Sequence, residues 1–138
     1  MNMNKVFCCL AFTLMLFVVF PGGTHSEEGF KTKDLLRKDI SAYAGGDMLL
    51  SVGEITIAPG ASSPKHRHPG PTFVYVLEGS VESEVEGTPS KVYSVGESFY
   101  ENPRQLHILT RNPSASKAAR ILVYHLSKNG EPLTTLEQ

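Results

Sequence analysis

Short runs of β-branched and aromatic residues, separated by glycine, proline and asparagine, follow one another from Met48 onward. This texture is typical of a β-sandwich or a small barrel, because short strands need turn residues at close spacing. No window of ordinary helix length carries a convincing amphipathic pattern, so we expect no long helix. The predicted strands are 48–58, 65–68, 73–78, 80–86, 90–94, 97–100, 106–110 and 120–127.

Two neighbouring runs show the clearest patterns. In 80–87, SVESEVEG, the residues Val81, Ser83 and Val85 share one face while three glutamates share the other, which predicts a strand with one buried side and one wet side. The preceding run 72–77, TFVYVL, is apolar on both faces, so we expect a central strand covered on each side. We expect the junction 78–80 to join the two as a hairpin.

The first 26 residues carry a different pattern: one early lysine, an apolar stretch of 14 residues from Phe7 to Phe20, then Pro-Gly-Gly and small residues. This is the layout of a secretory signal peptide. As a helix the stretch would reach about 21 Å, short of the roughly 30 Å that a membrane span needs. We therefore expect cleavage near Ser26, export to the periplasm or the extracellular space, and no stable membrane insertion afterwards. Retention as an uncleaved anchor is the alternative.

The remaining chain divides into three parts. Residues 27–47 are polar and suggest an N-terminal arm, with a turn or two of helix around 34–37. Residues 48–127 contain the predicted strands and form one compact domain. Residues 128–138 follow an Asn-Gly turn and are expected to be a docked or frayed tail. Both cysteines, Cys8 and Cys9, fall in the predicted signal peptide, so the mature protein would lack disulfides and thiolate ligands.

Charge excludes one class of function. The chain has 13 basic and 14 acidic residues, a net charge of −1 with histidine neutral, and no basic cluster beyond Lys65 and Arg67. A nucleic-acid binder needs a basic patch to neutralise phosphates. We therefore expect no nucleic-acid partner.

Histidines supply the candidate chemistry. His66 and His68 are two residues apart, so in an extended strand they point the same way, about 7 Å apart along the backbone, and can converge on one metal ion. Flanked by Lys65 and Arg67, the same pair could instead be an exposed basic loop. A third histidine, His107, opens a predicted apolar strand.

Residues 60–79 and 96–112 resemble the two motifs of the cupin superfamily, and the resemblance extends over most of the chain beyond the signal peptide. The residues that fall on motif positions are Gly60, His66, His68, Gly79, Gly96 and His107. Four positions depart from the pattern. Thr72 stands where the first motif has glutamate, and Arg104 stands where the second has glycine, while Pro103 and Asn112 each lie one position later than the proline and asparagine of the second motif. The resemblance implies an all-β fold, a double-stranded β-helix or jelly-roll barrel in a single domain, as in small single-domain cupins, and a homodimer.

The resemblance also implies a metal site at His66, His68 and His107. Because Thr72 is a weak ligand, we expect a three-histidine face without the usual carboxylate. Imidazole suits iron(II), zinc, nickel and copper, whereas manganese and magnesium prefer carboxylates. Among the four, the resemblance to iron-dependent cupin dioxygenases favours iron(II). Three protein ligands leave coordination positions open, as in a catalytic site.

Further residues are candidates for the substrate site. If Thr72 faces inward, alternation also turns Val74 and Val76 inward, and with Leu109 these residues would line a pocket suited to an apolar or aromatic small molecule, although each is equally explained as a core residue. Tyr100 and Glu101 are candidate catalytic groups, and Glu101 is also a candidate replacement for the missing carboxylate, with an outward orientation as the alternative. No cofactor other than the metal is expected. His125 lies far from both motifs and is predicted to be a surface histidine or one satisfied by neighbours.

Three functions remain open from the sequence. The leading one is a dioxygenase-type oxidoreductase acting on a small molecule through the metal. The second is a non-catalytic module that binds a metal or a small ligand. The third is a metal-assisted isomerase or lyase. The lost glutamate leaves it open whether the protein is an enzyme.

Overall fold

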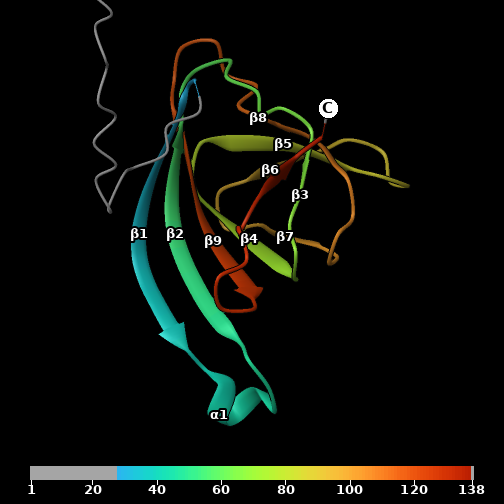
Figure 1. Ribbon diagram of the computed structural model, residues 1–138. Helices are drawn as coiled ribbons and strands as arrows, with labels where there is room; N and C mark the ends of the chain where they lie inside the picture. Colours follow the sequence, from blue (N-terminus) through green and yellow to red (C-terminus); the bar gives the residue numbers. More distant parts are fainter. Residues whose placement is uncertain (1–27, 138) are drawn as a thin grey trace, which may run out of the picture.

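The computed structural model describes residues 28–137, so the predicted signal peptide lies outside the described residues. Two five-stranded antiparallel sheets face each other (Figure 1). One sheet has the order β1-β2-β9-β4-β7, and the other has the order β10-β3-β8-β5-β6. The predicted all-β jelly-roll fold is confirmed. The strands are β1 Phe30–Asp39, β2 Leu49–Ile57, β3 His66–Arg67, β4 Thr72–Glu78, β5 Ser80–Val85, β6 Lys91–Ser94, β7 Ser98–Glu101, β8 His107–Arg111, β9 Ala119–Ser127 and β10 Thr135–Leu136.

The predicted polar arm contains a long strand instead of a helical turn. β1 pairs with β2 from Phe30 to Asp39 with a bulge between Asp34 and Leu36. Most of its side chains are exposed, because β1 is an edge strand. Its sequence is charged and alternates only weakly between apolar and polar residues, so the pattern did not predict a strand. For this reason the helix predicted at 34–37 is wrong. The helix α1, Ser41–Ala44, lies at the tip of the β1–β2 ribbon (Figure 1).

The predicted hairpin at 78–80 is also wrong. β4 belongs to the first sheet and β5 to the second, so the chain changes sheets at Gly79 and does not fold back on itself. Gly79 has φ +72°, and a Cβ there would lie 3.2 Å from the Ala119 backbone. Only glycine relieves both the backbone strain and this close approach. Gly79 is therefore a corner at which the chain passes from one sheet to the other, where the sequence had suggested the turn of a hairpin.

The apolar core lies between the two sheets. Its buried members are Phe30, Ile57, Val74, Val76, Val81, Ala119, Ile121 and Val123. The alternation predicted for β5 is confirmed at Val81 and Ser83, which are buried while Glu82 and Glu84 are not, but Val85 is only half-buried. The side chains of β4 alternate as well, but the outer face is not covered: Phe73 and Tyr75 are 47% and 43% exposed. The expectation of a covering layer on each side of β4 is therefore wrong for the described chain.

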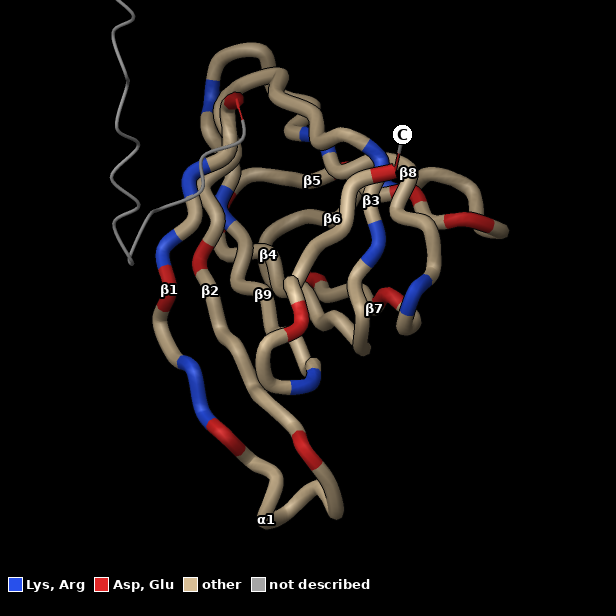
Figure 2. Tube along the Cα trace, viewed as in Figure 1, with Lys and Arg blue, Asp and Glu red and all other residues tan. Residues whose placement is uncertain are grey.

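Charged residues of both signs are interspersed along the chain, including β1 (Figure 2). Within residues 28–137, no helix is long and apolar enough to cross a membrane.

Candidate metal centre

Three strands bring four potential ligands together inside the barrel. His66 lies in β3 and is the register partner of His107 at the start of β8, His68 follows β3, and Glu101 ends β7. One ligand atom from each residue lies within 4.8 Å of every other, and all four residues are buried. The Nε2 atoms of His66 and His68 are 3.2 Å apart. Two donors bound to one ion at about 2.1 Å and at right angles would be about 3.0 Å apart, so this spacing suits a shared metal.

Each imidazole has its second nitrogen held by an oxygen. His66 Nδ1 donates to the Pro64 carbonyl at 2.9 Å, and His68 Nδ1 donates to the Leu133 carbonyl at 2.7 Å. Since both Nδ1 atoms carry the hydrogen, both neutral rings direct an Nε2 lone pair at the other. The two Nε2 atoms therefore cannot hydrogen-bond to each other, and a cation between them resolves the conflict. Carbonyl partners of this kind fix the orientation of metal-binding histidines.

Burial keeps the rings in the form that binds metals. Desolvation lowers the pKa of His66 to about 4, against the support of the Pro64 carbonyl. The pKa of His68 is also lowered, mainly by burial. Both rings are thus neutral at pH 7, which is the state a metal requires.

His107 is oriented by hydroxyls. Its Nε2 lies 3.1 Å from the Ser83 hydroxyl and 3.1 Å from the Thr110 hydroxyl, and both residues are buried. This leaves Nδ1 facing the site. The sequence contained a signal for one of these partners, because Ser83 sits between two apolar residues on the buried face of β5; nothing local pointed to Thr110 or to the Leu133 carbonyl.

Glu101 faces inward and supplies the carboxylate that the three-histidine expectation lacked. Its Oε2 lies 3.1 Å from His107 Nδ1 and 3.4 Å from His68 Nε2. Burial alone would raise the pKa of Glu101, but the adjoining His107 and the positive charge that the three imidazoles can carry outweigh it, so the pKa is lowered. The carboxyl group is therefore anionic at neutral pH.

Two buried atoms lack partners at this point. Glu101 Oε2 and His107 Nδ1 are 3.1 Å apart, and neither atom has a hydrogen-bond partner among the described residues. Unpaired buried polar atoms are rare and costly. A divalent ion would satisfy both at once, so the residues fit a metal.

The register of the first sheet explains why a carboxylate on β7 can take the place of the glutamate missing from β4. Thr72, at the position where the motif has glutamate, is the direct cross-strand partner of Glu101. Such partners have Cβ atoms about 5 Å apart on one face of the sheet. A carboxylate on β7 therefore reaches the same space as one on β4. Thr72 itself hydrogen-bonds to His125 Nδ1 at 3.0 Å.

His125 is partnered, as the sequence suggested, but it lies next to the site. Its ring centroid is 4.7 Å from that of His68, and burial lowers its pKa to about 3. It is the register partner of Thr72, on the neighbouring strands β9 and β4. The large separation of the two residues in the sequence gave no sign of this contact.

The other candidate residues lie elsewhere. Tyr100 is 45% exposed and packs on Phe73 on the outer face, because neighbours along a strand point to opposite sides and Glu101 takes the inside. Val74 and Val76 belong to the apolar core, and Leu109 is half-buried on β8. None of these residues, nor Thr72, lines the cavity of about 310 Å³ that opens beside His68. That cavity lies on the side of His68 that faces the tail, and tail residues such as Glu131 and Thr135 border it.

The tail completes the site. β10 pairs with β3, placing Leu136 opposite His66, and Glu137 binds Arg67 with a distance of 2.6 Å between Oε1 and Nε. Together with the Leu133 carbonyl, these contacts hold the histidine-bearing strand from the outside.

Comparisons with known proteins agree with this architecture. The model of the cupin domain matches residues 53–125. Among curated proteins there is no significant match. An RmlC-like cupin from Shewanella frigidimarina has a TM-score of 0.57 at 22% identity, over 80% of this chain and 83% of that one.

Two enzymes share the fold at similar identity. The lyase DddQ from Ruegeria pomeroyi, described as a DMSP lyase, has a TM-score of 0.62 at 21% identity, over 83% of this chain and 56% of that one. An oxalate oxidase in complex with the substrate analogue glycolate has a TM-score of 0.53 at 22% identity, over 78% of this chain and 59% of that one. The chain thus spans little more than half of either enzyme, and these likenesses show the fold alone. Because the family model covers more than half of the 138 residues, the protein belongs to the cupin family.

Proposed function

We propose that this protein is a metal-dependent oxidoreductase of the dioxygenase type, which binds iron(II) through His66, His68, Glu101 and His107. The observation that carries the proposal is the convergence of four buried donors, two of which have no hydrogen-bond partner among the described residues. When bound, the metal would supply open positions at which oxygen and a small molecule are activated. Imidazole and carboxylate donors with open positions are typical of non-haem iron(II) oxygenases.

The chain's own residues have distinct tasks in this proposal. The three imidazoles and the Glu101 carboxylate bind the ion, and the carboxylate supplies charge that neutral rings cannot. Glu101 is therefore assigned to metal binding and not to proton transfer. The oxygens of Pro64, Leu133, Ser83 and Thr110 hold the rings in place. Burial of the donors keeps bulk water from competing for the ion.

Glu101 also widens the range of metals that fit. The objection to manganese was the absence of a carboxylate, and a buried anionic oxygen removes it. Imidazole also suits zinc, nickel and copper, and iron(II) remains our preference because the proposed reaction uses dioxygen. Elemental analysis distinguishes iron from zinc, nickel, copper and manganese.

Elemental analysis of the purified protein tests the site. We expect about one equivalent of transition metal in the native chain and none in a His66→Ala/His68→Ala variant. Glu101→Thr should lose most of the metal, and the exchange Thr72→Glu/Glu101→Thr should recover it, since the two positions face each other across β4 and β7. Equal metal content in all four proteins would remove the site.

Oxygen uptake tests the reaction. Iron-loaded protein should consume dioxygen in the presence of its small-molecule substrate, and the His66→Ala/His68→Ala variant should not. A metal-loaded protein that binds small molecules without oxygen uptake would favour the non-catalytic module, and turnover without oxygen would favour an isomerase or lyase.

We also propose that the protein is exported after cleavage near Ser26. The support is the pattern of residues 1–26 in the sequence. Expression of the full chain with secretion-competent cells should yield an extracytoplasmic product, and mass spectrometry should give a mature N-terminus near residue 27. A cytoplasmic product that keeps Met1 would contradict this.

A homodimer is a further part of the proposal. The outer face of β4, β7 and β9 presents Phe73, Tyr100 and Tyr124, which are register neighbours and each more than a third exposed. An aromatic row of this kind suits a second copy of the chain. Light scattering should give twice the monomer mass for the native protein and a monomer for Phe73→Ser. The matched control, Val92→Ser, changes an exposed residue of β6 in the other sheet and should remain dimeric.

A further inference from the structure

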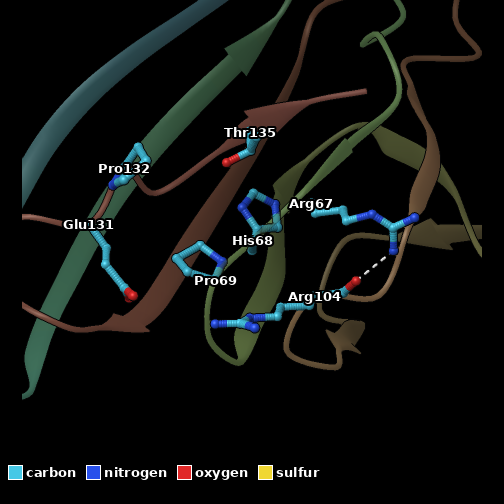
Figure 3. A pocket seen from close by; sticks show the side chains of 7 residues that line it. All are labelled: Arg67, His68, Pro69, Arg104, Glu131, Pro132 and Thr135. Carbon is cyan, nitrogen blue, oxygen red and sulfur yellow. Dashed lines mark hydrogen bonds between the residues drawn. The ribbon is translucent and has the colours of Figure 1, made fainter. Parts of the chain in front are cut away.

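The cavity beside His68 has the features of a binding site for an organic anion. It has a volume of about 310 Å³ and lies between the end of β3, the loop before β8 and the tail (Figure 3). Its lining residues are Arg67, His68, Pro69, Arg104, Glu131, Pro132 and Thr135. His68 forms part of its wall together with tail residues on either side of Leu133, whose carbonyl accepts from His68 Nδ1, while the other ring nitrogen, Nε2, faces the proposed metal centre.

Arg104 holds an unusual backbone conformation at this cavity. It is the one residue other than glycine with positive φ in the described chain, at +61°. The left-handed conformation disfavours any residue with a Cβ, and strain of this kind is retained where surrounding contacts enforce it. A glycine would adopt the same turn without that strain. An arginine at this position therefore lowers the stability of the fold relative to a glycine. A ligand contact made by its side chain in the cavity would explain why arginine stands there.

Hydrogen bonds to two neighbouring residues fix the backbone of Arg104. Its amide donates to the His68 carbonyl at 2.8 Å, and Arg67 Nη1 donates to its carbonyl at 2.6 Å. Arg67 also pairs with Glu137, so its guanidinium is already engaged. Figure 3 shows the two side chains pointing apart, with that of Arg104 running beside Pro69 toward the side where Glu131 lies. Arg67 thus acts as a brace for Arg104.

The guanidinium of Arg104 is available to a ligand. Within residues 28–137 it has neither a hydrogen bond nor an ion pair, whereas Arg67, Arg111 and Arg120 all have acidic partners. The acidic residue of the cavity, Glu131, uses its carboxylate to accept a hydrogen bond from the Lys128 amide at 3.2 Å. Pro69 and Pro132 add apolar surface.

From this geometry we infer that the cavity binds a small carboxylate with an apolar body, whose anionic group pairs with Arg104 while its body lies on the prolines beside His68. A planar guanidinium pairs with a carboxylate through two parallel hydrogen bonds, which gives orientation as well as affinity. The inference rests on the proposed function in taking this acid as the small-molecule ligand of the protein, and it narrows the predicted apolar or aromatic ligand to an acid.

The test uses benzoate as the probe and benzamide as its neutral counterpart of the same shape. Calorimetric titration of the native, metal-loaded protein should show benzoate binding at least about tenfold tighter than benzamide, with the difference shrinking as salt is added. In Arg104→Gly, benzoate should bind about tenfold weaker and benzamide as before. The control Lys117→Gln removes one positive charge from an exposed loop residue outside the cavity and should bind benzoate normally.

The choice of glycine separates binding from folding. Since glycine tolerates φ +61°, Arg104→Gly should unfold at the same temperature as the native protein or higher, with equal metal content. Equal benzoate affinity in native protein and Arg104→Gly would overturn the inference, as would equal affinity for benzoate and benzamide. Binding of benzoate that depends on Arg104 in a protein without metal or oxygen uptake would uphold the anion site while the proposed enzymatic function fails.

Discussion

The interior of the barrel has two regions built on opposite principles. One is apolar and centred on Ile57, Val76 and Val81, each fully buried. The other holds imidazoles, a carboxylate and hydroxyls at comparable burial, including His107 at 2% and Glu101 at 3% exposed. Apolar burial favours folding directly, whereas burial of ionisable groups opposes it unless they are paired. The apolar region therefore stabilises the barrel, and the polar region uses part of that stability to keep donors ready for a metal.

The largest expected effect falls on the polar region. His107→Ala removes one of the four ligands, and we expect metal affinity to fall by more than about 100-fold, judged by competition with a chromophoric chelator. His125→Gln is the matched control, since His125 touches His68 but is outside the ligand group. Retention of metal by His107→Ala would show that the two regions do not differ in function.

The next effect falls on the apolar region. Ile57→Ala leaves a cavity in the core and should lower the free energy of unfolding by about 2–5 kcal/mol. The protein that remains folded should keep its metal. Urea unfolding measures the first and elemental analysis the second, with Val92→Ala on the exposed surface as the control. Loss of metal without loss of stability would contradict the division of tasks.

Acid should weaken the metal-free protein through its buried imidazoles. The pKa of His66 is about 4 in the folded state and about 6.5 when unfolded, so between these values the unfolded chain binds the extra proton. Stability is therefore lost as pH falls from about 6.5 to about 4, by no more than about 3 kcal/mol from this residue. Urea unfolding at several pH values measures the slope, and His66→Gln should reduce it, with His68 and His125 supplying the remainder. The same slope in both proteins would exclude His66 as its source.

A smaller effect is expected from the hydroxyl that orients His107. Ser83→Ala removes a partner of Nε2 at 3.1 Å, and metal affinity should fall about tenfold. Thr110 keeps the ring partly oriented, which limits the loss. Ser80→Ala, on the other face of β5, should bind as the native protein does. A loss equal to that of His107→Ala would mean that Ser83 does more than orient the ring.

The sequence revealed strands better than it revealed neighbours. Alternation located β5, and the spacing of His66 and His68 indicated convergence on one face, because both patterns are local. The position of Glu101 depended on which residue of β7 faces Thr72, and that register is set by sheet pairing. Only one of Tyr100 and Glu101 can face inward on a strand, and the sequence did not decide which.

The sheet change at Gly79 and the exposed face of β4 escaped prediction for a related reason. A glycine between two strands is compatible with a hairpin and with a corner, and only packing against Ala119 distinguishes them. Apolar residues on both faces of a strand do not by themselves show that both faces are buried, since Phe73 and Tyr75 remain exposed in the described chain.

The bond from His68 to Leu133 has a consequence for biosynthesis. Because Leu133 follows β3 through β9 in the chain, a barrel that folds from its N-terminal side can form its apolar region while the His68 ring still lacks the carbonyl that fixes its orientation. In the proposed metal site, selection among competing ions would be deferred until the last strand has docked, and metal taken up earlier would meet an unfinished set of ligands.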